Sequence, residues 1–164
     1  MESAQGVTLT TVSEALEQAF PGCRIERRTE FLTAGQTEEA GRQAGDSVPS
    51  ALVVRYVASR DGVVTGIAYT DTHRVRTMAQ TVLVVVEPDG AVARVEVVSF
   101  AEPAEYVPRP AWYRLFAGRR LDGELSLTRA IRPVTGATLT SSATTRAVRR
   151  VLAIHSVLDH GGAR

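Results

Sequence analysis

The sequence predicts an α+β fold, with an antiparallel β-sheet built from hairpins, flanking helices and a C-terminal helix that follows a turn of small residues. Two pairs of β-branched runs surround Asp61-Gly62 and Asp89-Gly90. Asp-Gly between such runs is the strongest short-range hairpin signal. The strands come as hairpins and do not alternate with helices, which favours α+β over a doubly wound fold. A long apolar pattern with helical spacing then fills residues 140–158.

Composition indicates one globular domain. The 164 residues are 44% hydrophobic and 23% charged, which is ordinary for a folded chain. The net charge of +1 offers no general electrostatic reason to expect nucleic acid as a partner. The lone Cys23 excludes an internal disulfide and a cysteine-based metal site, and we expect no metal site. All 19 basic residues are Arg, which fits either a GC-rich genome or bidentate phosphate contacts.

Residues 1–50 are expected to form a helical extension packed on a domain of residues 51–160. Thr11 and Glu14 have the spacing of a helix cap before an apolar helical pattern that stops at Pro21-Gly22. Thr33 and Gln36 repeat this spacing before a second, short helix. Residues 45–50 are predicted to be a loop.

The two hairpins are expected at 53–58 with 63–69 and at 82–86 with 92–100. Simple alternation puts Val92 and Val98 on one face of the sheet and leaves one face partly wet. Residues 71–77 are predicted to be a helix start or an irregular turn, and residues 125–127 a short strand. The final helix is expected to begin near Thr140 or Ser141 and to point three arginines outward: Arg146, Arg149 and Arg150.

The longest apolar run, 82–86, is too short to span a bilayer, so no transmembrane segment is expected. No charged region followed by an apolar stretch opens the chain. Either the protein is cytoplasmic, or an export signal has been removed.

A turn of small, hydroxylated residues opens the final helix. Its members are Thr135, Gly136, Ala137, Thr138, Leu139, Thr140 and Ser141. Unpaired amides and the positive end of the helix dipole favour a phosphate at such a position, and Gly136 allows a close approach. The alternative is a plain helix cap at Thr140 or Ser141, since Ser and Thr are common caps.

The segment TGATLTSSATTRAVRRVLA, residues 135–153, resembles the flavin-attachment signature of FMN-binding domains. These domains include the flavin-carrying subunits of sodium-pumping NADH:quinone reductases and Rnf-type electron-transport complexes. The resemblance implies that Thr138 carries FMN as a phosphoester, attached by a flavin transferase that uses FAD as donor.

Arg132 departs from the family pattern, which has an acidic residue at this position. An acidic side chain would help the transferase to bind metal and substrate, whereas Arg reverses the local charge. FMN is therefore expected either covalently through Thr138 or without a bond, with Arg132 pairing with its phosphate. A solvent-exposed charge before Pro133 is the remaining interpretation of Arg132.

Weaker matches lie upstream of the motif. Residues 100–103, with Glu102, are similar to the family's loop beside the flavin, and residues 112–119 to an aromatic and basic segment. Four aromatic residues are candidates to border the flavin ring: Tyr106, Trp112, Tyr113 and Phe116. Core packing is the alternative for each and is preferred for Phe116. His73 and Arg76, with neighbouring Arg74, are candidates to reach the phosphate or the reduced ring, with plain solvent exposure as the alternative.

The resemblance implies an FMN-binding electron-transfer module of bacterial electron transport, an oxidoreductase component without substrate turnover of its own. Its partners would be redox proteins, with membrane-associated ones among the candidates, and its setting extracytoplasmic. One alternative is a non-redox sensing or docking domain that binds FMN non-covalently or has lost it. Another is a free-standing flavin reductase or oxidase with an open pocket beside the ring.

Overall fold

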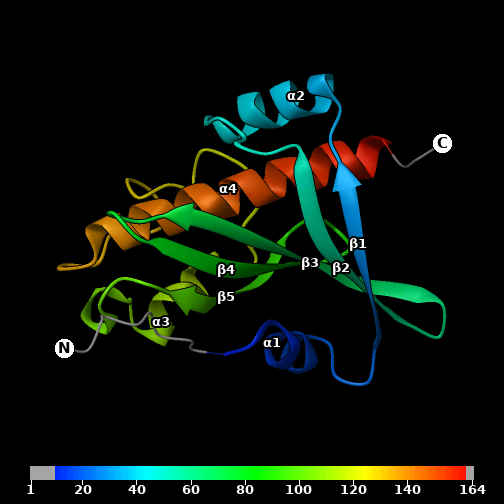
Figure 1. Ribbon diagram of the computed structural model, residues 1–164, viewed down its shortest axis with the longest axis horizontal. Coiled ribbons are helices and arrows are strands. Elements are labelled where there is room, and N and C mark those ends of the chain that lie inside the picture. Colours follow the sequence, from blue (N-terminus) through cyan, green and yellow to red (C-terminus); the bar gives the residue numbers. More distant parts are fainter. Residues whose placement is uncertain (1–9, 162–164) are drawn as a thin grey trace.

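The computed structural model describes residues 10–161 and contains a five-stranded antiparallel sheet in the order β1-β2-β3-β4-β5 (Figure 1). Each strand pairs with the next along the chain, so the predicted α+β fold built from hairpins is confirmed. The strands are β1 (Arg24–Phe31), β2 (Leu52–Arg60), β3 (Val63–Arg74), β4 (Ala79–Val86) and β5 (Val92–Phe100). The helices are α1 (Val12–Ala19), α2 (Ala34–Ala44), η1 (Ala104–Tyr106), α3 (Pro110–Tyr113), η2 (Arg114–Phe116) and α4 (Thr138–Gly161).

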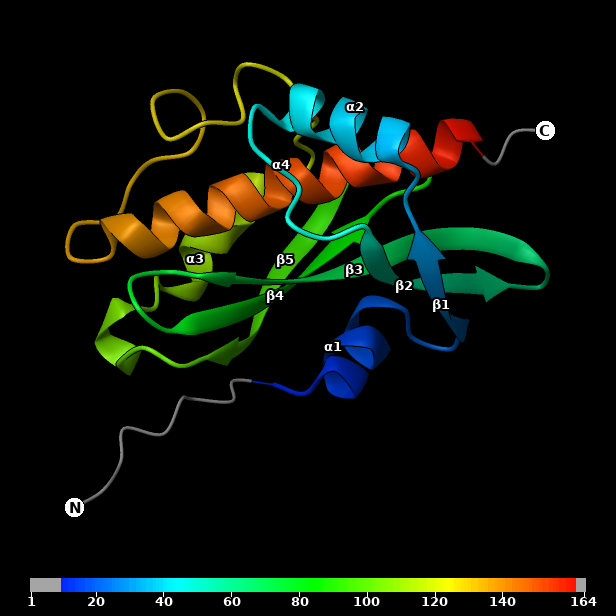
Figure 2. The ribbon, with the colours of Figure 1, turned by 45° about the horizontal axis from the view of Figure 1, so that its top comes forward.

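Helices cover both faces of the sheet. Helix α4 crosses one face with α2 beside it, and α1 lies on the opposite face (Figures 1 and 2). In β4, Val82, Val84 and Val86 enter the core below α4, while Leu83 and Val85 enter the core above α1. The sequence pattern predicted one partly wet face. That prediction is wrong at residues 82–86 of this interior strand, which are buried on both sides and are therefore continuously apolar.

Helix capping follows the sequence. The Thr11 hydroxyl accepts a hydrogen bond from the Glu14 amide at 3.0 Å, as its spacing predicted. Thr33 and Gln36 form the full reciprocal capping box at the start of α2. Each cap satisfies amide groups that a helix start leaves without an intrahelical partner.

The segment between α1 and α2 is a strand that the sequence pattern did not predict. Strand β1 pairs with β2 from Arg24↔Ser59 to Phe31↔Leu52. It is an edge strand with mostly exposed, charged side chains, so it carries no apolar alternation. Its backbone hydrogen bonds tie the N-terminal third of the described chain into the sheet.

Strand β5 departs from simple alternation. Register shifts against β4 occur between Thr81 and Val82 and between Val85 and Val86. Val92 therefore faces the α4 core and Val98 the α1 core, and the expectation that both share one face is wrong. A bulge adds one residue and so exchanges the faces of the residues that follow.

Three expected boundaries are corrected. Residues 71–74 continue β3, because their backbone pairs with β4 as far as Arg74↔Ala79. Residues 125–127 form turns instead of a strand, and α4 begins at Thr138, two residues before the earliest expected start. Among the described residues, no helix combines the length and the apolar run that crossing a bilayer requires.

Gly66 allows α1 to approach the sheet, which leads to a stability prediction. A Cβ at this position would lie 2.7 Å from Phe20 Cε1 and 3.2 Å from the Val86 carbonyl oxygen. We expect Gly66→Ala to lower the free energy of unfolding by about 1–3 kcal/mol, because the buried Phe20 ring must shift. Urea denaturation measures the change.

Gly123→Ala is the matched control, since a Cβ there meets no atom within 4 Å. It should change stability by no more than about 0.5 kcal/mol. Equal stability of the two variants would contradict the proposed close contact.

Candidate functional site

The turn that precedes α4 is held in one conformation by backbone geometry. The Ala137 amide donates to the Val134 carbonyl at 2.9 Å, which closes a four-residue turn. Gly136 has a φ of +83°, a value that favours glycine at the third position of such a turn. A Cβ on Gly136 would meet nothing within 4 Å, so the space above the turn is open.

Ser141 braces this turn against the first residues of α4. Its hydroxyl donates to the Ala137 carbonyl at 2.8 Å and accepts from the Val134 amide at 3.3 Å, and it is fully buried. The first helical backbone bond runs from the Ser141 amide to Ala137 at 2.9 Å. The amides of residues 138–140 precede that bond, the position at which helices bind anions. Ser141 thus supports the turn from within.

Thr138 lies at the surface at the start of α4. Its hydroxyl makes one hydrogen bond, a long one of 3.3 Å to the Val134 carbonyl, and the residue is exposed. A hydroxyl in this state retains lone pairs that face solvent. The resemblance assigned the flavin phosphate to this residue, and its exposure is compatible with that assignment.

A cavity of about 250 Å³ joins this turn to two other segments of the chain. Its lining consists of Arg76, Tyr106 and residues 136–140. Arg76 comes from the turn between β3 and β4, and Tyr106 from η1. The Arg76 guanidinium carbon lies 5.0 Å from the centre of the Tyr106 ring, a cation–π contact. These segments meet at the left end of the molecule in Figures 1 and 2.

Glu102 holds the turn that carries Arg76. One carboxylate oxygen accepts from the Thr77 amide at 2.9 Å and from the Met78 amide at 3.1 Å. The Thr77 hydrogen bond is the main reason why the pKa of Glu102 lies below its ordinary value. The sequence predicted Glu102 as a cofactor contact, but the structure places its carboxylate on the backbone of this turn and outside the cavity lining.

Arg132 and Trp112 are also outside the lining of the cavity. The Trp112 indole donates to the Arg132 carbonyl at 2.6 Å, while the Arg132 side chain is exposed. Trp112 is buried, and its ring packs edge-on against Tyr113 and Phe116 at centroid distances of 5.0 and 5.1 Å. Thr135 is exposed on the turn and does not line the cavity either.

His73 belongs to a buried polar chain next to the site. Its Nδ1 lies 2.9 Å from an Asp71 oxygen, and its Nε2 lies 2.7 Å from the Gln80 amide nitrogen. That nitrogen also donates to the Thr144 hydroxyl at 2.9 Å, while the Gln80 oxygen has no partner among the described residues. His73 thus links β3 to β4 and, through Gln80, to α4, and it does not line the cavity.

Arg150 closes this network with a buried ion pair. Its guanidinium contacts Asp71 at 2.9 Å and Asp46 at 3.2 Å, with the side chain only 8% exposed. Burial alone would raise the pKa of Asp71, but hydrogen bonds from His73 and Arg150 outweigh it and leave the pKa lowered. The expectation that Arg150 points outward is wrong, because two carboxylates draw it between α4 and the sheet.

Arg149 is likewise half-buried. Its guanidinium donates to the carbonyls of Ala44, Asp122 and Leu125 at 2.9, 2.8 and 3.0 Å. Only Arg146 of the three arginines is exposed as expected, and it still pairs with Asp46 at 3.0 Å. Asp46, Asp71 and Gln80 were not predicted to belong to this polar network. The one sequence signal for it was the presence of polar residues at alternate strand positions, as at Asp71 and His73.

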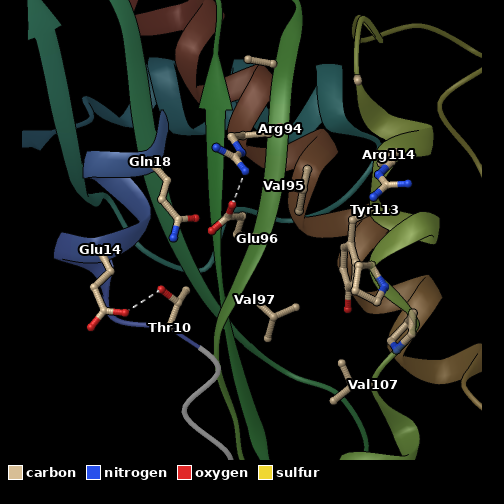
Figure 3. A pocket seen from close by; sticks show the side chains of 14 residues that line it. Thr10, Glu14, Gln18, Arg94, Val95, Glu96, Val97, Val107, Tyr113 and Arg114 are labelled. Carbon is tan, nitrogen blue, oxygen red and sulfur yellow. Dashed lines mark hydrogen bonds and ion pairs between the residues drawn. The ribbon is translucent and has the colours of Figure 1, made fainter. Parts of the chain in front are cut away.

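A larger cavity of about 670 Å³ lies elsewhere, along β5 between α1 and α3 (Figure 3). Val95, Val97 and Val107 form apolar walls, and Tyr113 lies opposite the ion pair between Arg94 and Glu96. Of the residues predicted as candidates to contact the cofactor, its lining includes Tyr113 alone. It is therefore separate from the cavity at the start of α4.

The buried pair between Asp71 and Arg150 leads to a stability prediction. Asp71→Asn leaves the buried Arg150 charge short of a carboxylate, and we expect a loss of about 3 kcal/mol of unfolding free energy at pH 7. Because the pKa of Asp71 is lowered, the wild type should lose this contribution as the pH falls below 3.8, the ordinary value. Urea denaturation at acid pH should therefore give similar free energies of unfolding for the wild type and Asp71→Asn.

Asp89→Asn is the control, because Asp89 forms an exposed ion pair with Arg120. Its effect at pH 7 should be small, since water and salt screen such pairs. A parallel pH profile for the wild type and Asp71→Asn would contradict the assignment.

Comparison with known proteins agrees with this geometry. Residues 77–153 match the family described as the FMN-binding domain. No curated protein matches the chain. The matched range begins on the turn that Glu102 holds, and it includes Tyr106 and the start of α4. Residues 77–153 are thus an FMN-binding domain by this match, which supports FMN as the cofactor.

Proposed function

We propose that the protein holds FMN with its phosphate at the start of α4 and relays electrons between redox partner proteins. The observation that carries this proposal is the cavity at which Arg76, Tyr106 and the turn of residues 136–140 meet beside the exposed Thr138. A cation, helix amides and a hydroxyl thus converge at one place. All three are ligands for a phosphate.

The cavity fits one end of the cofactor. Its volume of about 250 Å³ is below the roughly 300–1,000 Å³ of pockets that enclose a whole ligand. The lining is mostly apolar, and its polar side chains are Arg76, Thr138 and Thr140 with the Tyr106 hydroxyl. The phosphate would lie at Arg76 and Thr138, and the rest of the cofactor would extend beyond the cavity. The helix terminus contributes about 0.3–1 kcal/mol per charge when exposed and up to ~2 when partly buried. A charged hydrogen bond from Arg76 adds about 1.5–3 kcal/mol.

The lining favours a carrier over an enzyme that turns over a substrate. FMN supplies one- and two-electron redox chemistry when it is bound. Among the described residues, none of those that line the cavity is Asp, Glu, His or Cys. Those side chains most often act as general acids or bases, and Tyr106 is the lining residue whose hydroxyl could take that role. In this proposal the residues of the chain bind and orient the cofactor.

Two modes of attachment use the same residues. In the covalent mode, a flavin transferase forms a bond between the Thr138 oxygen and the FMN phosphorus of FAD. AMP leaves, and the hydroxyl proton passes to solvent. In the non-covalent mode, Arg76 and the helix amides hold the phosphate. Arg132 takes neither role in this proposal, because its side chain does not line the cavity.

A second candidate is a non-redox sensing or docking domain. Arg132, in place of the family's acidic residue, favours it, since transferase recognition would suffer from the reversed charge. A visible spectrum of protein purified with flavin and transferase present tests it first. Oxidised flavin is yellow, whereas a domain that has lost its cofactor is colourless.

Intact mass after co-expression with a flavin transferase distinguishes the two modes. If attachment is covalent, the mass increases by FMN minus water. Thr138→Ala should abolish the increase, and Thr138→Ser should retain it, because Ser keeps the hydroxyl. A yellow protein of unchanged mass indicates the non-covalent mode. Colourless protein after both co-expression and addition of FMN would contradict the proposed function.

Arg76 should dominate non-covalent affinity. We expect Arg76→Gln to weaken FMN binding by about 10–100-fold, the equivalent of one charged hydrogen bond. Quenching of FMN fluorescence measures the Kd. Arg74→Gln is the matched control, because Arg74 lies two residues away and outside the cavity lining. Equal losses in the two variants would remove Arg76 from the site.

A further inference from the structure

Four exposed arginines lie on the segments that meet where α4 begins: Arg74, Arg76, Arg109 and Arg132. Arg76 lines the cavity at the start of α4, and Arg74 lines a neighbouring cavity together with Asp46 and Arg150. Arg74 is the last residue of β3, and Arg76 lies in the turn after it. Arg109 directly precedes α3. The Arg132 backbone is fixed by Trp112 four residues before Gly136. Figures 1 and 2 show these segments together at the end of the molecule where α4 begins.

Few acidic side chains offset this charge. On residues 74–78, 101–109 and 132–140, the acidic residues are Glu102 and Glu105. Glu102 is buried on backbone amides, which leaves Glu105 exposed. Within the described chain, the side chains of Arg74, Arg109 and Arg132 form no ion pair. The whole chain carries a net charge of +1, and these three segments together hold four arginines against two glutamates.

Apolar side chains lie on the same segments as these arginines. Leu139 is 55% exposed and lines the cavity. Met78 is 45% exposed and sits on the turn that carries Arg76. Tyr106 adds a half-buried aromatic ring. An apolar centre of Met and aromatic side chains with arginines around it is the composition of a protein-binding surface.

We propose that this end, with Met78, Tyr106 and Leu139 at its centre and the four arginines as its rim, docks an acidic redox partner protein. The proposal rests on the proposed function and adds the chemistry of the partner. Carboxylates on the partner would face Arg74, Arg109 and Arg132, while Arg76 stays with the cofactor phosphate. Opposite charge accelerates encounter and aligns the partners without demanding tight binding.

The first test needs no flavin. Backbone amide NMR of the full chain is recorded while an octaglutamate peptide is added at low salt. We expect shift changes on the rim and centre residues and their loss at about 0.15 M salt, where screening acts over about 8 Å. Arg74→Glu/Arg109→Glu should abolish the changes. Arg24→Glu/Arg27→Glu, an equal charge change on the far edge strand β1, should leave them intact.

The second test uses FMN-loaded, reduced protein and two inorganic oxidants. Each ferricyanide anion or hexaammineruthenium(III) cation accepts one electron, so two are consumed per reduced flavin and the flavin protons pass to solvent. Arg74→Glu/Arg109→Glu should slow the anionic oxidant by about threefold or more and accelerate the cationic one. The β1 double variant should change neither rate appreciably.

Distinct outcomes overturn the two proposals separately. Two results would overturn the docking surface even if FMN binds. In one, the chemical-shift changes caused by the peptide spread over β1; in the other, they persist in Arg74→Glu/Arg109→Glu. Peptide shifts at the rim in a chain that never binds FMN would overturn the electron-carrier role and retain the acidic partner. Flotation of the protein with phosphatidylglycerol vesicles, lost in the same variant, would assign the surface to a membrane and overturn the protein partner.

Discussion

The buried ion pair between Arg150 and Asp71 sets the position of α4 on the sheet. Arg150 lies on α4, Asp71 lies near the end of β3, and Asp46 adds a second carboxylate from the segment after α2. An unpaired charge in such an environment is costly, so α4 cannot slide or rotate without losing this partner. The start of α4 is thereby placed beside the turn that follows β3. That placement creates the cavity.

Two braces then define the cavity within this frame. Ser141 holds the turn before α4, and Glu102 holds the turn between β3 and β4. Both side chains form hydrogen bonds with the backbone of these turns. In the proposed function, the contacts with a phosphate fall to Arg76, Thr138 and the first amides of the helix. Some residues of the segments that resemble the family therefore hold the turns of the site in place, and others line its cavity.

The chemistry of the lining and the charge of the surroundings are consistent with each other. A cavity lined by a cation, helix amides and a hydroxyl is suited to an anion. In the proposed function, the part of the cofactor that extends beyond this small cavity is accessible to another protein. Exposed arginines and apolar side chains occupy the surface around that opening. A transient, charge-guided encounter fits this combination better than a permanent interface does.

The sequence by itself determined the features that depend on local chemistry. Asp-Gly turns, the caps at Thr11 and Thr33, and the small-residue turn before α4 were all predicted, because each acts within a few residues of chain. The family resemblance indicated residues 136–140, and the needs of a flavin ring and phosphate indicated Tyr106 and Arg76. The structure brings all of these residues together around one cavity.

Only the tertiary structure decided the rest. Strand β1 forms because β2 offers it a hydrogen-bonding edge, which its own charged residues do not reveal. Arg150 is buried because carboxylates distant in the sequence form ion pairs with it. The Trp112 side chain lies outside the cavity lining because its indole donates to the Arg132 carbonyl and its ring packs against Tyr113 and Phe116. Burial and pairing across such separations are properties of the assembled fold, and no local pattern encodes them.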